Sequence, residues 1–393
     1  MPATKAASNR PLEGITVVDL TQILAGPYCT RLLADAGATV IKIEPPTGDP
    51  SRHLPPYISA NRSGYFANLN TGKLSVQVDL RSEVGIEHVR SLAADADVLV
   101  ENMRPGSLVG KGLGYEVLSR LNPRLVMASI SAFGNTGEFA GRAGQGIIAE
   151  AYSGVLDMTG LADGAPLNQG ISLADVSAGI HAYAAIVTAL YRRDRGDGLG
   201  EYIDVALFDA TLPFQETAFL EVQLGGAEVD PTRNGMEHRS VTPYGVYRAG
   251  HDYIAVAAGT DRLWHRLEAL ICCDEAAPVD LSTNDRRTKH RDIVRDMIEQ
   301  WASRVGGGDA AVGQLQQAGI PAGPIRKVRE VGETEPARSR ESFATVPDPV
   351  LGQIAVVNTP FKMSRSAVGP TKSAPVLGEH THTILADQAR EEQ

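Results

Sequence analysis

The chain has 393 residues, of which 43% are hydrophobic, and a formal net charge of −10 at pH 7. This length and apolar content are sufficient for two domains with buried cores. The acidic balance argues against a chain-wide attraction to nucleic acid or to an anionic membrane, so an anionic ligand must be held by local Lys and Arg side chains.

The three cysteines, Cys29, Cys272 and Cys273, match neither a disulfide framework nor a zinc site. Residues 1–10 are polar and lack the apolar region of a signal peptide, and no run of 18 or more apolar residues predicts a membrane span. We therefore expect a cytoplasmic protein that binds no metal, no membrane and no nucleic acid.

Short β-branched runs alternate with amphipathic stretches in the first half of the chain. We predict a helix over 25–37, with Pro27 in its first turn, and a polar helix over 82–95. The predicted strands are 15–20, 39–44, 74–80, 97–102 and 125–130. This alternation predicts a parallel sheet that is covered by helices on both faces.

Apolar side chains recur at helical spacing from Val176 to Tyr191, which predicts a helix that follows Asp175 and ends within 192–198. A further strand is expected over 202–208. A hairpin with its turn near Gly250 and two more helices are expected over 242–258, 262–273 and 286–304.

These elements predict an α/β protein with two domains. The large domain begins with residues 11–225 and has a Rossmann-like parallel sheet. A smaller α+β domain covers 226–330, and residues 331–393 return to the large domain.

The turn after the first predicted strand lacks the fingerprint of a dinucleotide-binding site. Residues 21–27 read TQILAGP, without the G-x-G-x-x-G glycines that let a backbone approach pyrophosphate. Glu44 ends the second strand, where a ribose-binding carboxylate would stand. Without the glycines, however, NAD is not the expected ligand.

The stretch GISLADVSAG (170–179) places one carboxylate, Asp175, where an apolar run meets a predicted helix. Asp is a favoured N-cap, so capping is the simplest interpretation. A carboxylate at a helix N-terminus is also kept ionised by the helix dipole and by amide donors, and an ionised carboxylate can attack an activated acyl group. The two roles are compatible, and this stretch alone leaves both open.

Several segments, in their order and spacing, resemble the class III CoA-transferase family, which includes formyl-CoA transferase, carnitine CoA-transferase and the α-methylacyl-CoA racemases. The resemblance covers almost the whole chain. The segments are LEGITVVDLTQILAGPYCTRLLADAGATVIKIEPP (12–46), NTGKLSVQVDL (70–80), ADVLVENMRPG (96–106), LNPRLVMASISAFG (121–134), SGVLDMTG (153–160), GEYIDVALFDA (200–210) and PVLGEHT (375–381). The resemblance implies an interlocked homodimer.

The resemblance also implies that Asp175 is the nucleophile. In the family mechanism the Asp attacks the donor thioester to form a mixed anhydride, and CoA thiolate converts this into an aspartyl-CoA thioester. The acceptor acid then leaves as its own CoA thioester. This chemistry uses a coenzyme A thioester as substrate, an acyl-CoA donor and a carboxylic acid acceptor, with no prosthetic group.

Most of the implied CoA contacts match the family, but three positions depart from formyl-CoA transferase. Leu24 replaces a Gln, Pro45 replaces a basic residue, and Gly110 replaces an Arg beside Lys111. The segment 233–240 corresponds to a glycine loop that shields the intermediates, and a plain turn is the alternative. The implied CoA-binding residues are Leu24, Ala25, Asn70, Lys73, Asn102, Met103, Arg104, Lys111, Arg142, Ala143 and Gly144.

Gln145 separates two activities of the family. The racemases pair the Asp with a His in a G-H-D motif, whereas this chain has AGQGI (143–147). An amide cannot act as a base at neutral pH, but it can donate a hydrogen bond to a thioester or anhydride oxygen. We therefore predict CoA transfer, with Asp175 and Gln145 as catalytic residues. A 2-methylacyl-CoA racemase and a catalytically idle CoA-binding protein are the alternatives.

Arginines near these motifs indicate the class of acid. Arg104, Arg142 and Arg233 could each pair with a second carboxylate. Dicarboxylic acids such as succinate are therefore the expected substrates.

Overall fold

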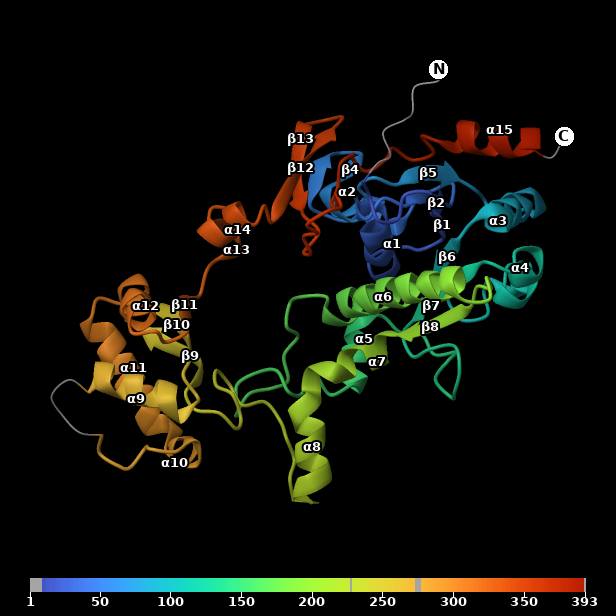
Figure 1. Ribbon diagram of the computed structural model, residues 1–393. Coiled ribbons are helices and arrows are strands. Elements are labelled where there is room, and N and C mark those ends of the chain that lie inside the picture. Colours follow the sequence, from blue (N-terminus) through green and yellow to red (C-terminus); the bar gives the residue numbers. More distant parts are fainter. Residues whose placement is uncertain (1–8, 227, 273–276, 392–393) are drawn as a thin grey trace. The chain divides into compact units, whose positions relative to one another are not determined.

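The computed structural model describes residues 9–226, 228–272 and 277–391, so Cys273 lies outside the described residues (Figure 1). The chain divides into two compact units. The larger unit comprises residues 9–155, 170–220 and 335–391, and the smaller unit comprises the described residues of 156–169 and 221–334. The sequence places the smaller domain at 226–330, whereas the structure adds the segment 156–169 from the first half of the chain.

A six-stranded parallel sheet forms the centre of the larger unit, as the sequence predicts. Its strand order is β5–β2–β1–β6–β7–β8, which is the order of doubly wound dinucleotide-binding sheets. The order reverses between β1 and β6. The strands are β1 (Thr16–Asp19), β2 (Thr39–Glu44), β5 (Leu74–Gln77), β6 (Val98–Glu101), β7 (Val126–Ser131) and β8 (Tyr202–Ala206).

The two faces of this sheet are covered by different helices (Figure 1). Successive side chains of a strand point to opposite faces. Val17 and Val98 pack against α1 (Ala25–Asp35) and α6 (Leu173–Arg195), whereas Val18 and Leu99 pack against α3 (Glu83–Asp95) and α4 (Tyr115–Leu121). Burial on both faces explains the apolar runs of the central strands β1 and β6, whereas burial alternates along the edge strand β8.

Helix α6 is the longest described helix, and by length and composition it could cross a membrane. That is weak evidence, because the core helix of a globular domain passes the same test. Ala178, Ala182 and Ile186 of α6 have no exposed surface and belong to the apolar core beneath the sheet. In this structure α6 is a core helix.

Shorter elements complete the larger unit. They are a 3-10 turn (Pro50–His53), β3 (Tyr57–Ser59), β4 (Arg62–Ser63), α2 (Gly64–Leu69), a 3-10 turn (Val109–Lys111), α5 (Gly146–Tyr152), α7 (Leu207–Thr211), a 3-10 turn (Leu212–Gln215), α14 (Glu335–Ser339), β12 (Phe343–Asp348), β13 (Gly352–Val357) and α15 (Thr381–Glu391). Helix α8 (Glu216–Gly225) runs across the division between the two units.

The smaller unit is built on a three-stranded antiparallel sheet in the order β11–β10–β9. The predicted hairpin is confirmed, with Gly250 at φ +69° in its turn. The predicted helix over 286–304 is two helices, which meet at His290. The elements are β9 (Tyr244–Ala249), β10 (Asp252–Ala257), α9 (Asp261–Ile271), α10 (Asn284–Lys289), α11 (Arg291–Arg304), α12 (Gly308–Gln317), β11 (Ala322–Pro324) and α13 (Val328–Val331).

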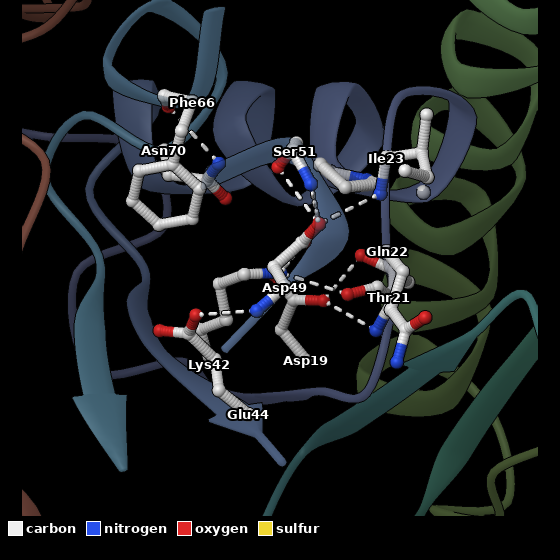
Figure 2. A network of polar contacts seen from close by, with 12 residues as sticks. Asp19, Thr21, Gln22, Ile23, Lys42, Glu44, Asp49, Ser51, Phe66 and Asn70 are labelled. Atoms are coloured by element: carbon white, nitrogen blue, oxygen red, sulfur yellow. Dashed lines mark hydrogen bonds and ion pairs between the residues drawn. The ribbon is translucent and has the colours of Figure 1, made fainter. Parts of the chain in front are cut away.

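A network of buried charges lies beneath the loop that joins β1 to α1 (Figure 2). Asp19, Lys42 and Lys73 are at most 2% exposed. The Lys73 ammonium is 3.0 Å from the Asp19 carboxylate, and the Lys42 ammonium is 2.9 Å from that of Asp49. Burial alone would raise the pKa of Asp19, but the ammonium groups of Lys73 and Lys42 hold it at about 2. The network is therefore ionised at neutral pH.

The same network fixes the loop backbone. Lys42 donates to the carbonyl of Thr21 at 2.7 Å, and Asp49 accepts from the amide of Ile23 at 3.2 Å. Figure 2 shows Ser51 turned toward the same oxygen of Asp49, to which its hydroxyl donates at 2.7 Å. Lys42 and Asp49 thus hold the loop backbone at Thr21 and at Ile23.

Asn70 and Lys73 were predicted to contact CoA, and the structure places them inside this network instead. Asn70 has no exposed surface, and its amide donates to the carbonyl of Phe66 at 3.0 Å. The Lys73 ammonium lies within hydrogen-bond distance of oxygens of Asp19, Pro27, Thr30 and Asn70. Both side chains are fully used in holding the fold, so that prediction is corrected.

We expect Lys73→Met to lower the free energy of unfolding by about 3 kcal/mol, because it leaves the buried Asp19 carboxylate without its nearest cation. Urea denaturation measures this. Lys111→Met is the control, since the Lys111 ammonium donates to the carbonyl of Leu80 at the protein surface and its loss should cost under about 1 kcal/mol. A Lys73→Met protein of unchanged stability would contradict a structural role.

Candidate functional site

A cavity of about 900 Å³ opens at the carboxyl ends of β1, β6 and β7. This is where the strand order reverses, and in doubly wound sheets ligands bind at that point. The first residues of α5 and α6 complete its wall. The lining residues are Gln22, Ile23, Leu24, Ala25, Leu54, Tyr65, Asn102, Met103, Arg104, Pro105, Ile130, Ser131, Ala132, Arg142, Ala143, Gly144, Gln145, Gly146, Ile147, Ile148, Ser172, Asp175 and Leu207.

Most of the predicted site residues meet in this one cavity, although they come from stretches far apart in the sequence. The exceptions are Asn70 and Lys73, which lie in the buried network, and Lys111, which lines a neighbouring pocket. The predicted residues in the cavity are Leu24, Ala25, Asn102, Met103, Arg104, Arg142, Ala143, Gly144, Gln145 and Asp175.

The loop after β1 forms one wall and has an uncommon backbone. Ile23 has φ +66°, a left-handed conformation that β-branched residues rarely adopt. Asn102 fixes Gln22, the residue that precedes Ile23. The Asn102 side chain accepts from the backbone amide of Gln22 and donates to its backbone carbonyl, each at 2.8 Å. Asn102 was predicted as a CoA contact, and its amide is occupied with positioning this loop.

Asp175 is the third residue of α6, so of the two roles that the sequence left open the structure does not support the N-cap role. The N-cap is Ser172, whose side chain makes no capping hydrogen bond. The carboxylate of Glu150, on α5, accepts from the amide of Ala174 at 3.0 Å and supplies that function from another helix. The Asp175 side chain is therefore free to face the cavity.

Gly146, the first residue of α5, lies against the Asp175 carboxylate. A Cβ added at this glycine would lie 2.2 Å from Oδ2 of Asp175, which no real contact allows. The glycine therefore provides the space in which the carboxylate sits. Sequence reasoning missed Gly146 and Glu150, although a glycine beginning a helix is an uncommon choice that could have drawn attention.

Burial, followed by the carboxylate of Glu150, raises the pKa of Asp175 to about 6. The sequence predicts instead that helix-terminal donors keep this group firmly ionised. One hydrogen bond from the backbone amide of Asp175 itself lowers this pKa, but it does not offset the effects of burial and of Glu150. Asp175 is ionised above about pH 6, in a less stable anionic state than a surface carboxylate.

Positive charge in the cavity comes from Arg104 and Arg142. Neither forms an ion pair with the residues that the structure describes, and Arg142 lies over the ring of Phe139 at 3.6 Å. Arg233 is instead bound within the smaller unit, where it is 2.7 Å from Asp157. Arg233 therefore has a carboxylate partner already.

A second pocket, of about 360 Å³, adjoins the cavity and shares Gln22 and Met103 with it. Two cations line it, Lys111 and Arg81, together with Asp79, whose carboxylate accepts from Arg81 at 2.8 and 2.9 Å. Arg81 was not predicted, although its position just beyond the carboxyl end of β5 is a signal that could have found it.

Across the described ranges 9–226, 228–272 and 277–391, no group of three or more His, Cys, Asp or Glu residues is arranged to hold a metal ion.

We expect Asp175→Asn to raise Tm by about 2 °C at pH 8 and by less at pH 5. The pKa of Asp175 is higher in the folded protein than in the unfolded chain, so its ionisation removes stability as the pH rises from about 4 to about 6. Above that range the full penalty is present, and Asn removes it. Calorimetry at both pH values measures the difference.

The control for this variant is Asp209→Asn, which changes an exposed residue in the first turn of α7. Its Tm should differ little from that of the unmodified protein at either pH. A lower Tm for Asp175→Asn at pH 8 would show that the carboxylate stabilises the fold.

Comparisons with known proteins agree with one another. The sequence model of CoA-transferase family III matches residues 12–381. A succinyl-CoA:mesaconate CoA-transferase of Haloarcula hispanica is 34% identical, over 95% of each chain, and a succinyl-CoA:glutarate CoA-transferase of Mus musculus is 32% identical, over 99% of this chain and 89% of the other.

Solved structures show the same fold. The crystal structure of a CaiB/BaiF family protein from Brucella suis superimposes with a TM-score of 0.84 at 34% identity, and covers 97% of this chain and 100% of that one. The likeness spans both units and the segments that line the cavity. The chain therefore belongs to CoA-transferase family III and is a CoA-transferase.

Proposed function

We propose that the protein transfers CoA from an acyl-CoA thioester to a dicarboxylic acid through a covalent intermediate on Asp175. The observation that carries this proposal is the position of Asp175, a half-buried carboxylate that lines the cavity of about 900 Å³ at the carboxyl ends of the strands. A desolvated carboxylate is more nucleophilic than a solvated one, because its charge is poorly stabilised before attack.

The reaction proceeds by acyl transfer. A carboxylate oxygen of Asp175 attacks the thioester carbonyl carbon, the C–S bond breaks, and CoA leaves as its thiolate. The thiolate then attacks the aspartyl carbonyl of the anhydride and releases the first acid as its carboxylate. The acceptor carboxylate attacks the aspartyl carbonyl of this thioester, the C–S bond breaks, and the thiolate leaves a second mixed anhydride. The thiolate then attacks the acceptor's carbonyl carbon in that anhydride, which forms the CoA thioester of the acceptor and releases the Asp175 carboxylate.

Gln145 is proposed to donate a hydrogen bond to the oxygen on which negative charge develops. It is the N-cap residue of α5, directly before Gly146, and its exposed side chain makes no capping hydrogen bond. A neutral amide suits this role and cannot act as the second base that a racemase needs.

The CoA moiety is proposed to extend from the cavity into the neighbouring pocket. Lys111 supplies positive charge there for the phosphates, and Arg104 does so at the cavity, whereas the charge of Arg81 is paired with Asp79. The pantetheine arm would pass Gln22 and Met103, which line both spaces. Leu24, Ala25, Ala143 and Gly144 then face the thioester end.

Dicarboxylic acids are proposed because the relatives named above act on succinyl-CoA with mesaconate or glutarate. The distal carboxylate needs a cation within the cavity. Arg142 is the best placed, because it is four residues before Gly146, which contacts the Asp175 carboxylate. The expected interlocked homodimer and cytoplasmic location remain proposals that rest on the resemblance and on the sequence.

We expect Asp175→Ala to abolish transfer from succinyl-CoA to glutarate while the protein stays folded, and hydroxylamine treatment of the acylated wild type to modify the peptide containing Asp175. In the wild type, kcat/KM should fall as the pH drops through about 6, because the nucleophile becomes protonated. Asp209→Ala should keep full activity.

Two results would contradict the nucleophile proposal. One is residual transfer by Asp175→Ala above a trace. The other is gain of α-deuterium by 2-methylacyl-CoA in deuterium oxide without any acceptor acid, which would favour the racemase.

Arg142→Met should raise the KM of glutarate about tenfold and leave that of pentanoate, its monocarboxylic counterpart, nearly unchanged, because one charge-assisted hydrogen bond is lost. Arg104→Met should raise the KM of succinyl-CoA instead. Steady-state kinetics with both acceptors measures the effects. Equal effects of Arg142→Met on the two acceptors would show that Arg142 does not hold the distal carboxylate.

A further inference from the structure

Glu150 is a buried carboxylate that the proposed mechanism does not use. It lies on α5, and only 2% of the residue is exposed. Charged groups are rarely buried to this extent unless they are paired or hydrogen-bonded. No cation forms an ion pair with Glu150 in the part of the chain that the structure describes. Its carboxylate accepts a hydrogen bond from the backbone amide of Ala174 at 3.0 Å.

This bond places a second negative charge beside the active-site carboxylate. Ala174 precedes Asp175 in the first turn of α6, and α5 packs against α6. Gly146, one turn before Glu150 on α5, leaves room for the Asp175 carboxylate. The same helix therefore provides both the space for Asp175 and a like charge near it.

We propose that Glu150 is a positioning residue that both orients the first turn of α6 and drives acylation of Asp175 by electrostatic repulsion. This inference rests on the proposed function. A simple cap requires only an acceptor for the Ala174 amide, which a neutral side chain could supply. A carboxylate adds a charge that a cap does not need.

The repulsion between Glu150 and Asp175 acts before the acyl transfer and is absent after it. Before attack, two carboxylates lie at the junction of α5 and α6, where burial and the charge of Glu150 both disfavour the ionised form of Asp175. When an oxygen of Asp175 bonds to the acyl carbon and the thiolate departs, the aspartyl group becomes a neutral anhydride. Its negative charge leaves with the sulfur, and the repulsion ends. The charge of Glu150 thus disfavours the free enzyme relative to both covalent intermediates.

Other groups around Asp175 do not duplicate this effect. Tyr65, on α2, lines the same cavity, and its own pKa is raised by burial and by Asp175. Arg104 and Arg142 also line the cavity, but the raised pKa of Asp175 arises from burial and from Glu150. Tyr28 and Cys29 on α1 lie against Gly179, one turn beyond Asp175, and the exposed Asp209 is on α7, which also packs against α6.

The test uses Glu150→Gln, which keeps an oxygen acceptor for the Ala174 amide and removes the charge. We expect the acid limb of the kcat profile to move to lower pH by about half a unit or more. At pH 8, kcat should fall by about three- to tenfold while KM stays within about twofold. On mixing with succinyl-CoA, intact-protein mass spectrometry should show a smaller covalently modified fraction than in the wild type.

Glu150→Asp is the matched variant, because it keeps the charge but withdraws it from Asp175 by one methylene. Its acid limb should lie between those of the wild type and Glu150→Gln, with kcat partly restored. If Glu150→Gln does not fold, Glu150→Asp alone still tests the direction of the shift. An acid limb and modified fraction equal to the wild type, in whichever of these variants folds, would overturn the inference.

Failure of the proposed function is distinguishable from failure of this inference. If the wild type forms no adduct on Asp175 and Asp175→Ala still transfers CoA, the nucleophile is wrong and Glu150 has nothing to drive. If the wild type forms the adduct and the Glu150 variants do so equally well, the nucleophile stands and Glu150 is only a helix cap.

Discussion

The active-site carboxylate depends on the contact between α5 and the first turn of α6. Glu150 accepts from the backbone of that turn, and Gly146 leaves the space that Asp175 occupies. Helix α6 is itself fixed by small and branched side chains in the core beneath the sheet. The position of the proposed nucleophile is therefore set by helix packing, which is more exact than a loop could provide.

The opposite wall of the cavity is held by a different interaction. The loop after β1 carries the left-handed Ile23, and such a conformation persists only when its surroundings enforce it. Asp49, Lys42 and Asn102 do so through hydrogen bonds to three consecutive residues of the loop. The charges that hold this wall are buried, whereas the arginines of the cavity are exposed and available to a ligand.

The elements of the fold were predictable from the sequence, whereas the contacts between distant residues that hold the cavity walls were not. Local patterns predict the parallel sheet, because buried strands are continuous β-branched runs, and they predict the helix that carries Asp175. The roles of Lys73 and Glu150 depend on partners that tertiary packing supplies, 54 and 24 residues away in the sequence. Periodicity carries no information on such pairs, so the resemblance alone assigned Lys73 to CoA, and the sequence could not show that Glu150 accepts the amide that an N-cap side chain would take.

The charge distribution also bears on catalysis. A chain with a net charge of −10 that belongs to this family binds an anionic thioester, and the cations proposed to hold it line the cavity and its neighbouring pocket. The two carboxylates stand at the junction of α5 and α6, where burial penalises charge. In the proposed mechanism, attraction at the arginines contributes to binding, while the destabilised carboxylate contributes to reaction. Only the destabilisation of the carboxylate changes when the proposed covalent bond forms, so it is the effect that would lower the barrier.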